Sequence, residues 1–108
     1  MASLFDQSKD IVTRLGVSIS GHDFDSFLAP ERQLLSAIKR LAIDAKLDVR
    51  DYEYAETRTE QIVLGKTGVK RLEELRKTLV AASEYNLFSA IDVAQLSAQI
   101  EQLISRIE

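Results

Sequence analysis

The residues best suited to chemistry in this sequence are Gly65, Lys66 and Thr67, which read like the end of a phosphate-binding loop. Such a loop follows the pattern G-x-x-x-x-G-K-[ST], because its first glycine lets backbone N–H groups curl around the phosphates. The position five residues before Gly65 is Glu60, whose carboxylate would repel a phosphate. The spacing therefore predicts a turn, in which Gly65 ends one helix and Thr67 caps the next.

Three carboxylates would share one helical face if the segment that carries them is helical: Glu53, Glu56 and Glu60. Such a stripe can bind Mg²⁺ together with phosphates, as in all-α nucleotide pyrophosphatases. Those enzymes pair Glu-Glu-x-x-Glu with Glu-x-x-Asp on a neighbouring helix, and neither Glu53–Glu56 nor the pair Glu73-Glu74 matches this pattern. A small Mg²⁺-dependent all-α phosphohydrolase is therefore the alternative hypothesis, and a solvated helix face is the preferred interpretation.

The only histidine is His22, which precedes Asp23, and the chain contains no cysteine. One histidine without thiolates makes a poor zinc site, and a histidine next to an aspartate in a loop more often forms part of a turn. We therefore expect no catalytic residue, no cofactor and no metal site, and hence a protein that is not an enzyme.

A local group of basic residues could contact a phosphate backbone. Its members are Lys66, Lys70, Arg71, Arg76 and Lys77. Glu73 and Glu74 interrupt the group, and the net charge of -3 removes long-range attraction to nucleic acid. A nucleic-acid-binding adaptor is therefore the least favoured alternative.

Length and composition indicate an ordinary globular chain. The 108 residues predict a single domain over residues 1–108, with 45% apolar and 29% charged side chains, close to the averages for folded proteins. The sequence lacks an apolar run of about 18 residues and a basic, apolar leader at its start. We expect a cytoplasmic protein that contacts neither membrane nor nucleic acid.

Helical spacing of apolar residues predicts an all-α antiparallel bundle of about five helices. The first four are expected over residues 3–15, 30–46, 48–64 and 68–85, with Ser3 as an N-cap, Gly16 after the first helix and Pro30 opening the second. Residues 17–29 are expected to be irregular. Two alternatives stay open: a short strand within residues 47–64, and two long bent helices joined at Gly65–Gly68.

The fifth helix carries the most regular pattern, which resembles a coiled coil. Asp92 and Gln95 fit a capping box, with Ile91 placed to pack on Leu96. Apolar residues then follow a 3-4-3-4 spacing, at Val93, Leu96, Ile100, Leu103 and Ile107.

This stripe predicts a non-enzymatic interaction, regulatory or scaffold module, which buries the stripe against itself in a homodimer or against another helical protein. The same stripe would look identical if it packed within a single chain.

Overall fold

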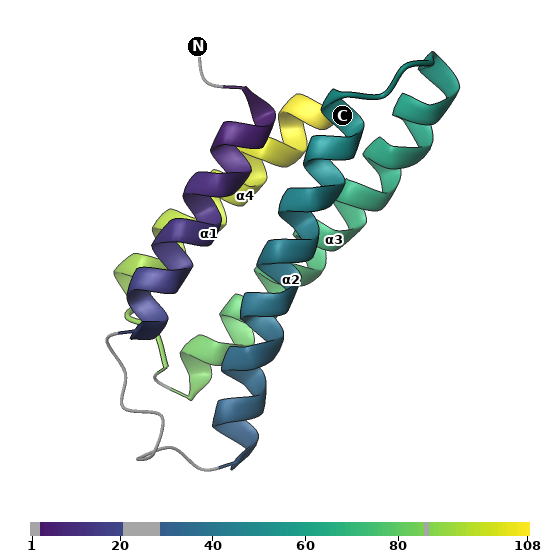
Figure 1. The fold of residues 1–108 in the computed structure, drawn as a ribbon. Helices are drawn as coiled ribbons and strands as arrows, with labels where there is room; N and C mark the ends of the chain where they lie inside the picture. Colours follow the sequence, from purple (N-terminus) through teal and green to yellow (C-terminus); the bar gives the residue numbers. More distant parts are fainter. Residues whose placement is uncertain (1–2, 21–28, 86) are drawn as a thin grey trace.

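Four α-helices make up the described part of the chain in a computed structural model, which covers residues 3–20, 29–85 and 87–108. They are α1 (Leu4–Ser20), α2 (Ala29–Glu53), α3 (Arg58–Glu84) and α4 (Ala90–Ile107). Each helix runs antiparallel to its neighbours, in an elongated bundle of 48 × 25 × 19 Å (Figure 1). The all-α prediction is confirmed, whereas the expected number of five helices is wrong for these residues.

The difference in number arises in the middle of the chain, where the predicted helices 30–46, 48–64 and 68–85 form only two. The connection between α2 and α3 lies at residues 54–57, and Gly65–Gly68 is inside α3. Thr57 has an extended backbone, and its hydroxyl accepts a hydrogen bond from the N–H of Glu60 at 3.1 Å. This N-cap starts α3. The predicted turn at Gly65–Gly68 is therefore wrong, and residues 47–64 contain no strand.

Gly65 and Gly68 are buried because α2 passes close to α3 at both positions. A Cβ atom on Gly65 would lie 3.1 Å from Cε2 of Tyr52 and 3.4 Å from Cγ2 of Ile107. A Cβ atom on Gly68 would lie 3.8 Å from Cβ of Asp48. At Gly65 the missing side chain therefore makes room for an aromatic ring, whereas at Gly68 a methyl group would make only an ordinary contact.

The core collects one apolar face from each helix. The most deeply buried large side chains are Leu15, Leu35, Ile38, Val49, Leu72, Leu75, Leu79, Leu87, Ile100 and Leu103. Phe88, in the connection before α4, is also buried, at 6% exposure. At about 25 cal/mol per Å² of apolar surface, this burial is the main source of stability.

Polar contacts join each pair of neighbouring helices and set their relative register. The contacts are Leu4 N to Glu53 Oε1 at 2.7 Å (α1–α2), Arg71 to Asp48 at 3.0 Å and Asp44 at 3.4 Å (α2–α3), Arg76 to Glu101 at 2.8 Å (α3–α4), and Gln99 to Asp10 at 3.2 Å (α1–α4). Most of these groups are partly exposed, so each contact contributes little energy, but each fixes a position along the helix.

The start of α1 agrees with the prediction, whereas its end does not. Ser3 is the N-cap, as expected, and its hydroxyl accepts from the N–H of Asp6 at 3.0 Å. At the other end, α1 continues through Gly16 to Ser20, because an exposed glycine inside a helix costs only about 1 kcal/mol. Of the segment 17–29 expected to be irregular, residues 17–20 and 29 are helical, and residues 21–28, including His22, lie outside the described residues.

The start of α4 also differs from the prediction. Ser89 is the N-cap, and its hydroxyl accepts from the N–H of Asp92 at 3.1 Å, so Asp92 lies in the first turn of the helix. Ile91 is 71% exposed and does not form the expected staple with Leu96. Within the described residues, no helix has both the length and the apolar character needed to span a bilayer.

We expect Gly68→Ala to stabilise the protein by about 1 kcal/mol, because alanine is the better helix former and its methyl group fits beside Asp48. Gly65→Ala gains the same helix propensity but requires Tyr52 and Ile107 to move, so it should be less stable than Gly68→Ala. Chemical denaturation of both variants measures the difference. A similar large loss in both variants would indicate that the glycines form a turn after all.

Candidate functional site

The apolar stripe of α4 lies inside the bundle. Leu96, Ile100 and Leu103 are at most 3% exposed, Val93 is 9% exposed, and Ile107 is half-buried against the same core. The alternative considered from the sequence, packing within a single chain, therefore describes these side chains. In this arrangement, a partner could reach only the end of the stripe, at Ile107.

The three carboxylates considered for Mg²⁺ are on different elements. Glu53 is the last residue of α2, Glu56 lies in the connection, and Glu60 is in the first turn of α3. The Glu53 carboxylate accepts hydrogen bonds from the N–H groups of Leu4 at 2.7 Å and Phe5 at 3.3 Å, so it caps α1. Among the described residues, no three acidic or histidine side chains are grouped so as to hold a metal ion.

The basic group on α3 is divided by ion pairing. Arg71 bridges Asp44 and Asp48, and Arg76 pairs with Glu101. Lys66, Lys70 and Lys77 are exposed and form no ion pair within the described part of the chain. The two arginines thus hold the bundle together, and only the lysines remain for external contacts.

The Gly65-Lys66-Thr67 motif is helical in its whole length. Its N–H groups take part in the hydrogen bonds of α3, and the Thr67 hydroxyl donates to the carbonyl of Val63 at 3.2 Å. This backbone cannot curl around a phosphate as a phosphate-binding loop does.

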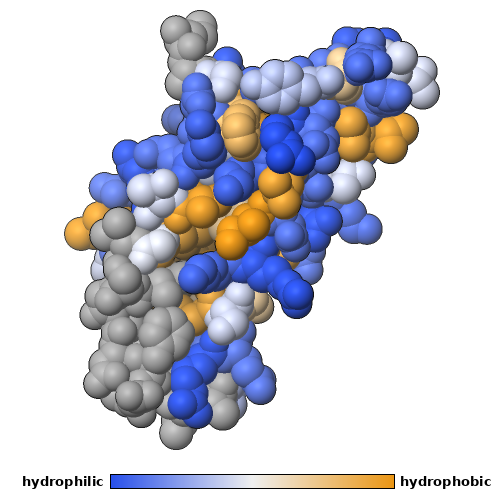
Figure 2. Space-filling model, in the orientation of Figure 1, coloured by the Kyte–Doolittle hydropathy of each residue, from blue (hydrophilic) through white to orange (hydrophobic). Residues whose placement is uncertain are grey.

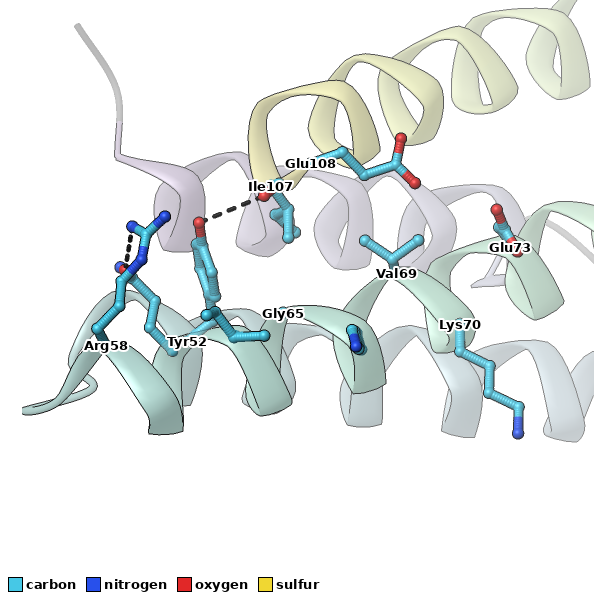
Figure 3. Close-up of a pocket in the computed structure, with 11 residues that line it drawn as sticks. Tyr52, Arg58, Gly65, Val69, Lys70, Glu73, Ile107 and Glu108 are labelled. Carbon is cyan, nitrogen blue, oxygen red and sulfur yellow. Dashed lines mark hydrogen bonds between the residues drawn. The ribbon is translucent and has the colours of Figure 1, made fainter.

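A groove of about 430 Å³ opens where α3 extends beyond the end of α4 (Figure 3). At about 1.5 Å per residue, α3 is about 40 Å long and α4 about 27 Å. Ile107, near the end of α4, lies level with Gly65, so the first two turns of α3 have no α4 residues beside them. The groove thus lies along α3 beside Ile107.

The floor of the groove is apolar. It is formed by Ile62 and Val69 of α3, Ile107 of α4 and the ring of Tyr52 from α2. The Tyr52 hydroxyl donates to the carbonyl of Ile107 at 3.4 Å, and its ring lies over Gly65 (Figure 3). Ile62 is 48% exposed, and apolar side chains also reach the surface at this protruding end of the bundle in Figure 2.

Charged side chains line the groove in an uneven distribution. Arg58, Lys66 and Lys70 of α3 line the groove. Glu73 and Glu108 lie past Val69, away from Arg58 (Figure 3). None of the five forms an ion pair within the described residues, and Arg58 contacts only the side-chain oxygen of Gln61, at 3.5 Å. The groove therefore presents unpaired positive charge along one side and negative charge at one end.

Comparison with known proteins gives no assignment. No protein-family model, curated protein or solved structure matches this chain.

The groove was not anticipated from the sequence, although one signal for its position was present. Thr57 and Glu60 have the spacing of a capping box, which places the start of α3 there and keeps Ile62 in its second turn.

A shifted pKa occurs elsewhere: Lys9, at 3.1 Å, lowers the pKa of the Asp6 carboxyl, with a smaller effect of Ser3. Asp6 does not line the groove.

Ile100→Ala should destabilise the protein by about 3 kcal/mol, because it leaves a cavity at a fully buried position of α4. Ile91→Ala, on the exposed side of the same helix, should change the free energy of unfolding by less than about 0.5 kcal/mol. Urea denaturation measures both. Equal, small effects would mean that α4 does not pack as described.

Glu53→Gln should destabilise the protein by about 1 kcal/mol, because the neutral side chain interacts less well with the N-terminus of α1. Glu56→Gln, at an exposed position, is the matched control. Thermal melts with and without Mg²⁺ add a second comparison, in which we expect no change for the wild type. A Mg²⁺-dependent rise that disappears in Glu53→Gln would instead support the metal hypothesis.

Proposed function

We propose that this chain is a non-enzymatic interaction module that binds a helix of another protein in the groove between α3 and the end of α4. The observation that carries the proposal is Ile62, which is 48% exposed and continues an apolar floor of Val69, Ile107 and Tyr52. Exposed apolar side chains gathered in a groove commonly mark a binding surface.

The shape of the groove favours a helix. It follows the axis of α3 from Arg58 to Glu73, so a partner helix that lies along α3 would contact Ile62, Val69 and Ile107 together. Burial of about 300 Å² of apolar surface contributes about 7 kcal/mol, from which the cost of association must be subtracted. We therefore expect transient binding, with a Kd weaker than micromolar.

The other functions considered from the sequence receive less support. Self-association through the α4 stripe would require α4 to leave the bundle and expose Ile100 and Leu103, at a high cost in apolar hydration. A phosphohydrolase would need Glu53, Glu56 and Glu60 to converge, and Glu53 already caps α1. A nucleic-acid site loses Arg71 and Arg76 to ion pairs.

A displayed library of helical peptides tests the proposal. The peptides have about 14 residues, span about 21 Å, and carry randomised residues along an apolar stripe and its two edges. Peptides selected on the folded protein should bind Ile62→Ser about 10-fold more weakly than wild type, because about 1.4 kcal/mol of apolar contact is lost.

Val63→Ser is the matched control, because Val63 is 58% exposed, adjacent in sequence and outside the groove. It should bind the selected peptides like the wild type. Recovery of no binding peptide, or equal weakening by both substitutions, would refute the groove as a helix-binding site.

A further inference from the structure

We propose that the helix bound in this groove carries carboxylates on the edge that faces α3, and that it runs antiparallel to α3. This inference rests on the proposed function and specifies the partner's chemistry. It depends on the charges that surround the groove and on their positions along α3.

Arg58, Lys66 and Lys70 form no ion pair within the described residues. Lys66 and Lys70 are exposed on consecutive turns of α3, and Arg58 lies about two turns earlier, so the three span about 18 Å. In contrast, Arg71 and Arg76 of the same helix are both held by carboxylates of neighbouring helices. The cations that remain unpaired on the groove side would gain partners if a bound helix supplied carboxylates along that edge.

Negative charge marks one end of the groove. Glu73 and Glu108 lie near each other beyond Val69, about four turns along α3 from Arg58 (Figure 3). The N-terminus of a helix carries a partial positive charge and its C-terminus a partial negative charge. A bound helix is therefore favoured with its N-terminus at Glu73 and Glu108 and its C-terminus near Arg58, which is antiparallel to α3.

The apolar floor agrees with this arrangement. Ile62 and Val69 are seven residues apart on α3, which is the repeat of a two-helix seam, and Gly65 lies between them. A partner with apolar residues at positions i, i+3 or i+4, and i+7 would contact both side chains and Ile107. Its acidic residues would then lie beside the seam, opposite Lys66 and Lys70.

The same pattern disfavours a phosphate backbone as the occupant. A nucleic acid strand carries negative charge along its whole length, so it would meet Glu73 and Glu108 at one end of the groove. A helix can carry carboxylates along one edge and a partial positive charge at its N-terminus. It thus matches both the cations along α3 and the carboxylates at the end of the groove.

Matched synthetic peptides test the charge. Three peptides keep one apolar stripe chosen in the selection and carry only Glu, only Gln or only Lys at the edge positions. Titration should show the Glu peptide binding about 10-fold more tightly than the Lys peptide at low ionic strength, with the difference falling in about 1 M salt.

Charge reversal in the protein provides the decisive comparison. Lys66→Glu with Lys70→Glu should invert the order, so that the Lys peptide binds more tightly than the Glu peptide. Lys77→Glu is the control, because Lys77 is an exposed lysine on the same helix that does not line the groove, and it should leave the order unchanged.

A spin label on the peptide N-terminus tests the direction. It should broaden the backbone amide signals of Val69 and Glu73 more than that of Arg58, and the reverse would show a parallel helix. Binding through Ile62 without a preference for the Glu peptide would overturn the charge inference and leave the proposed function intact. If none of the three peptides bound the protein, both the charge inference and the proposed function would be overturned.

A second copy of the chain is the remaining occupant to test. Sedimentation of the protein alone at about 1 mM should show a monomer. A dimer that Ile62→Ser abolishes and Val63→Ser does not would show that the groove binds another copy, and would overturn the inference of a separate acidic helix.

Discussion

The close approach of α2 to α3 at Gly65, where the Tyr52 ring lies against the α3 backbone, is the constraint on which the rest of the structure depends. Without a Cβ atom at Gly65, the Tyr52 ring can pack against the α3 backbone, whereas Gly68 has room for a methyl group beside Asp48. Two glycines inside a helix cost about 2 kcal/mol in helix propensity, which the packing of the two longest helices must offset. Their interaction keeps α3 continuous through a segment that would otherwise be its weakest point.

The groove follows from this continuity. Because α3 does not end at Gly65, it extends as far as Arg58, past the level at which α4 ends at Ile107. The Tyr52 ring, seated on Gly65, becomes part of the groove floor and contacts the last turn of α4 through its hydroxyl. The contact of Tyr52 with Gly65 thus supplies part of the floor of the candidate binding surface.

The sequence predicts the faces of the helices better than their ends. Leu72, Leu75 and Leu79 have helical spacing within the predicted helix 68–85 and are buried on one side of α3, because apolar periodicity reports on burial. The turn predicted at Gly65–Gly68 is wrong, because a glycine that ends a helix and a glycine that makes room for a neighbouring ring look the same in the sequence. The Thr57 cap would have resolved this ambiguity, as its side chain can satisfy free N–H groups only at a helix start.

The groove and the role of the α4 stripe could not be predicted in the same way. Periodicity shows that Ile100 and Leu103 are hidden, but it does not distinguish a neighbour in the same chain from a second chain. Similarly, the groove combines Tyr52 of α2, Ile62 of α3 and Ile107 of α4, which are far apart in the sequence. The apolar pattern of a single helix contains no information on which residues of other helices lie beside it.

Hydrogen exchange of individual backbone amides tests the central claim most directly. If α3 is continuous and packed on α2, the amides of residues 65–68 should exchange as slowly as those of residues 72–75 and far more slowly than those of residues 54–57. Fast exchange at residues 65–68, with protection at residues 54–57, would place the turn at the glycines and contradict both the fold and the groove derived from it.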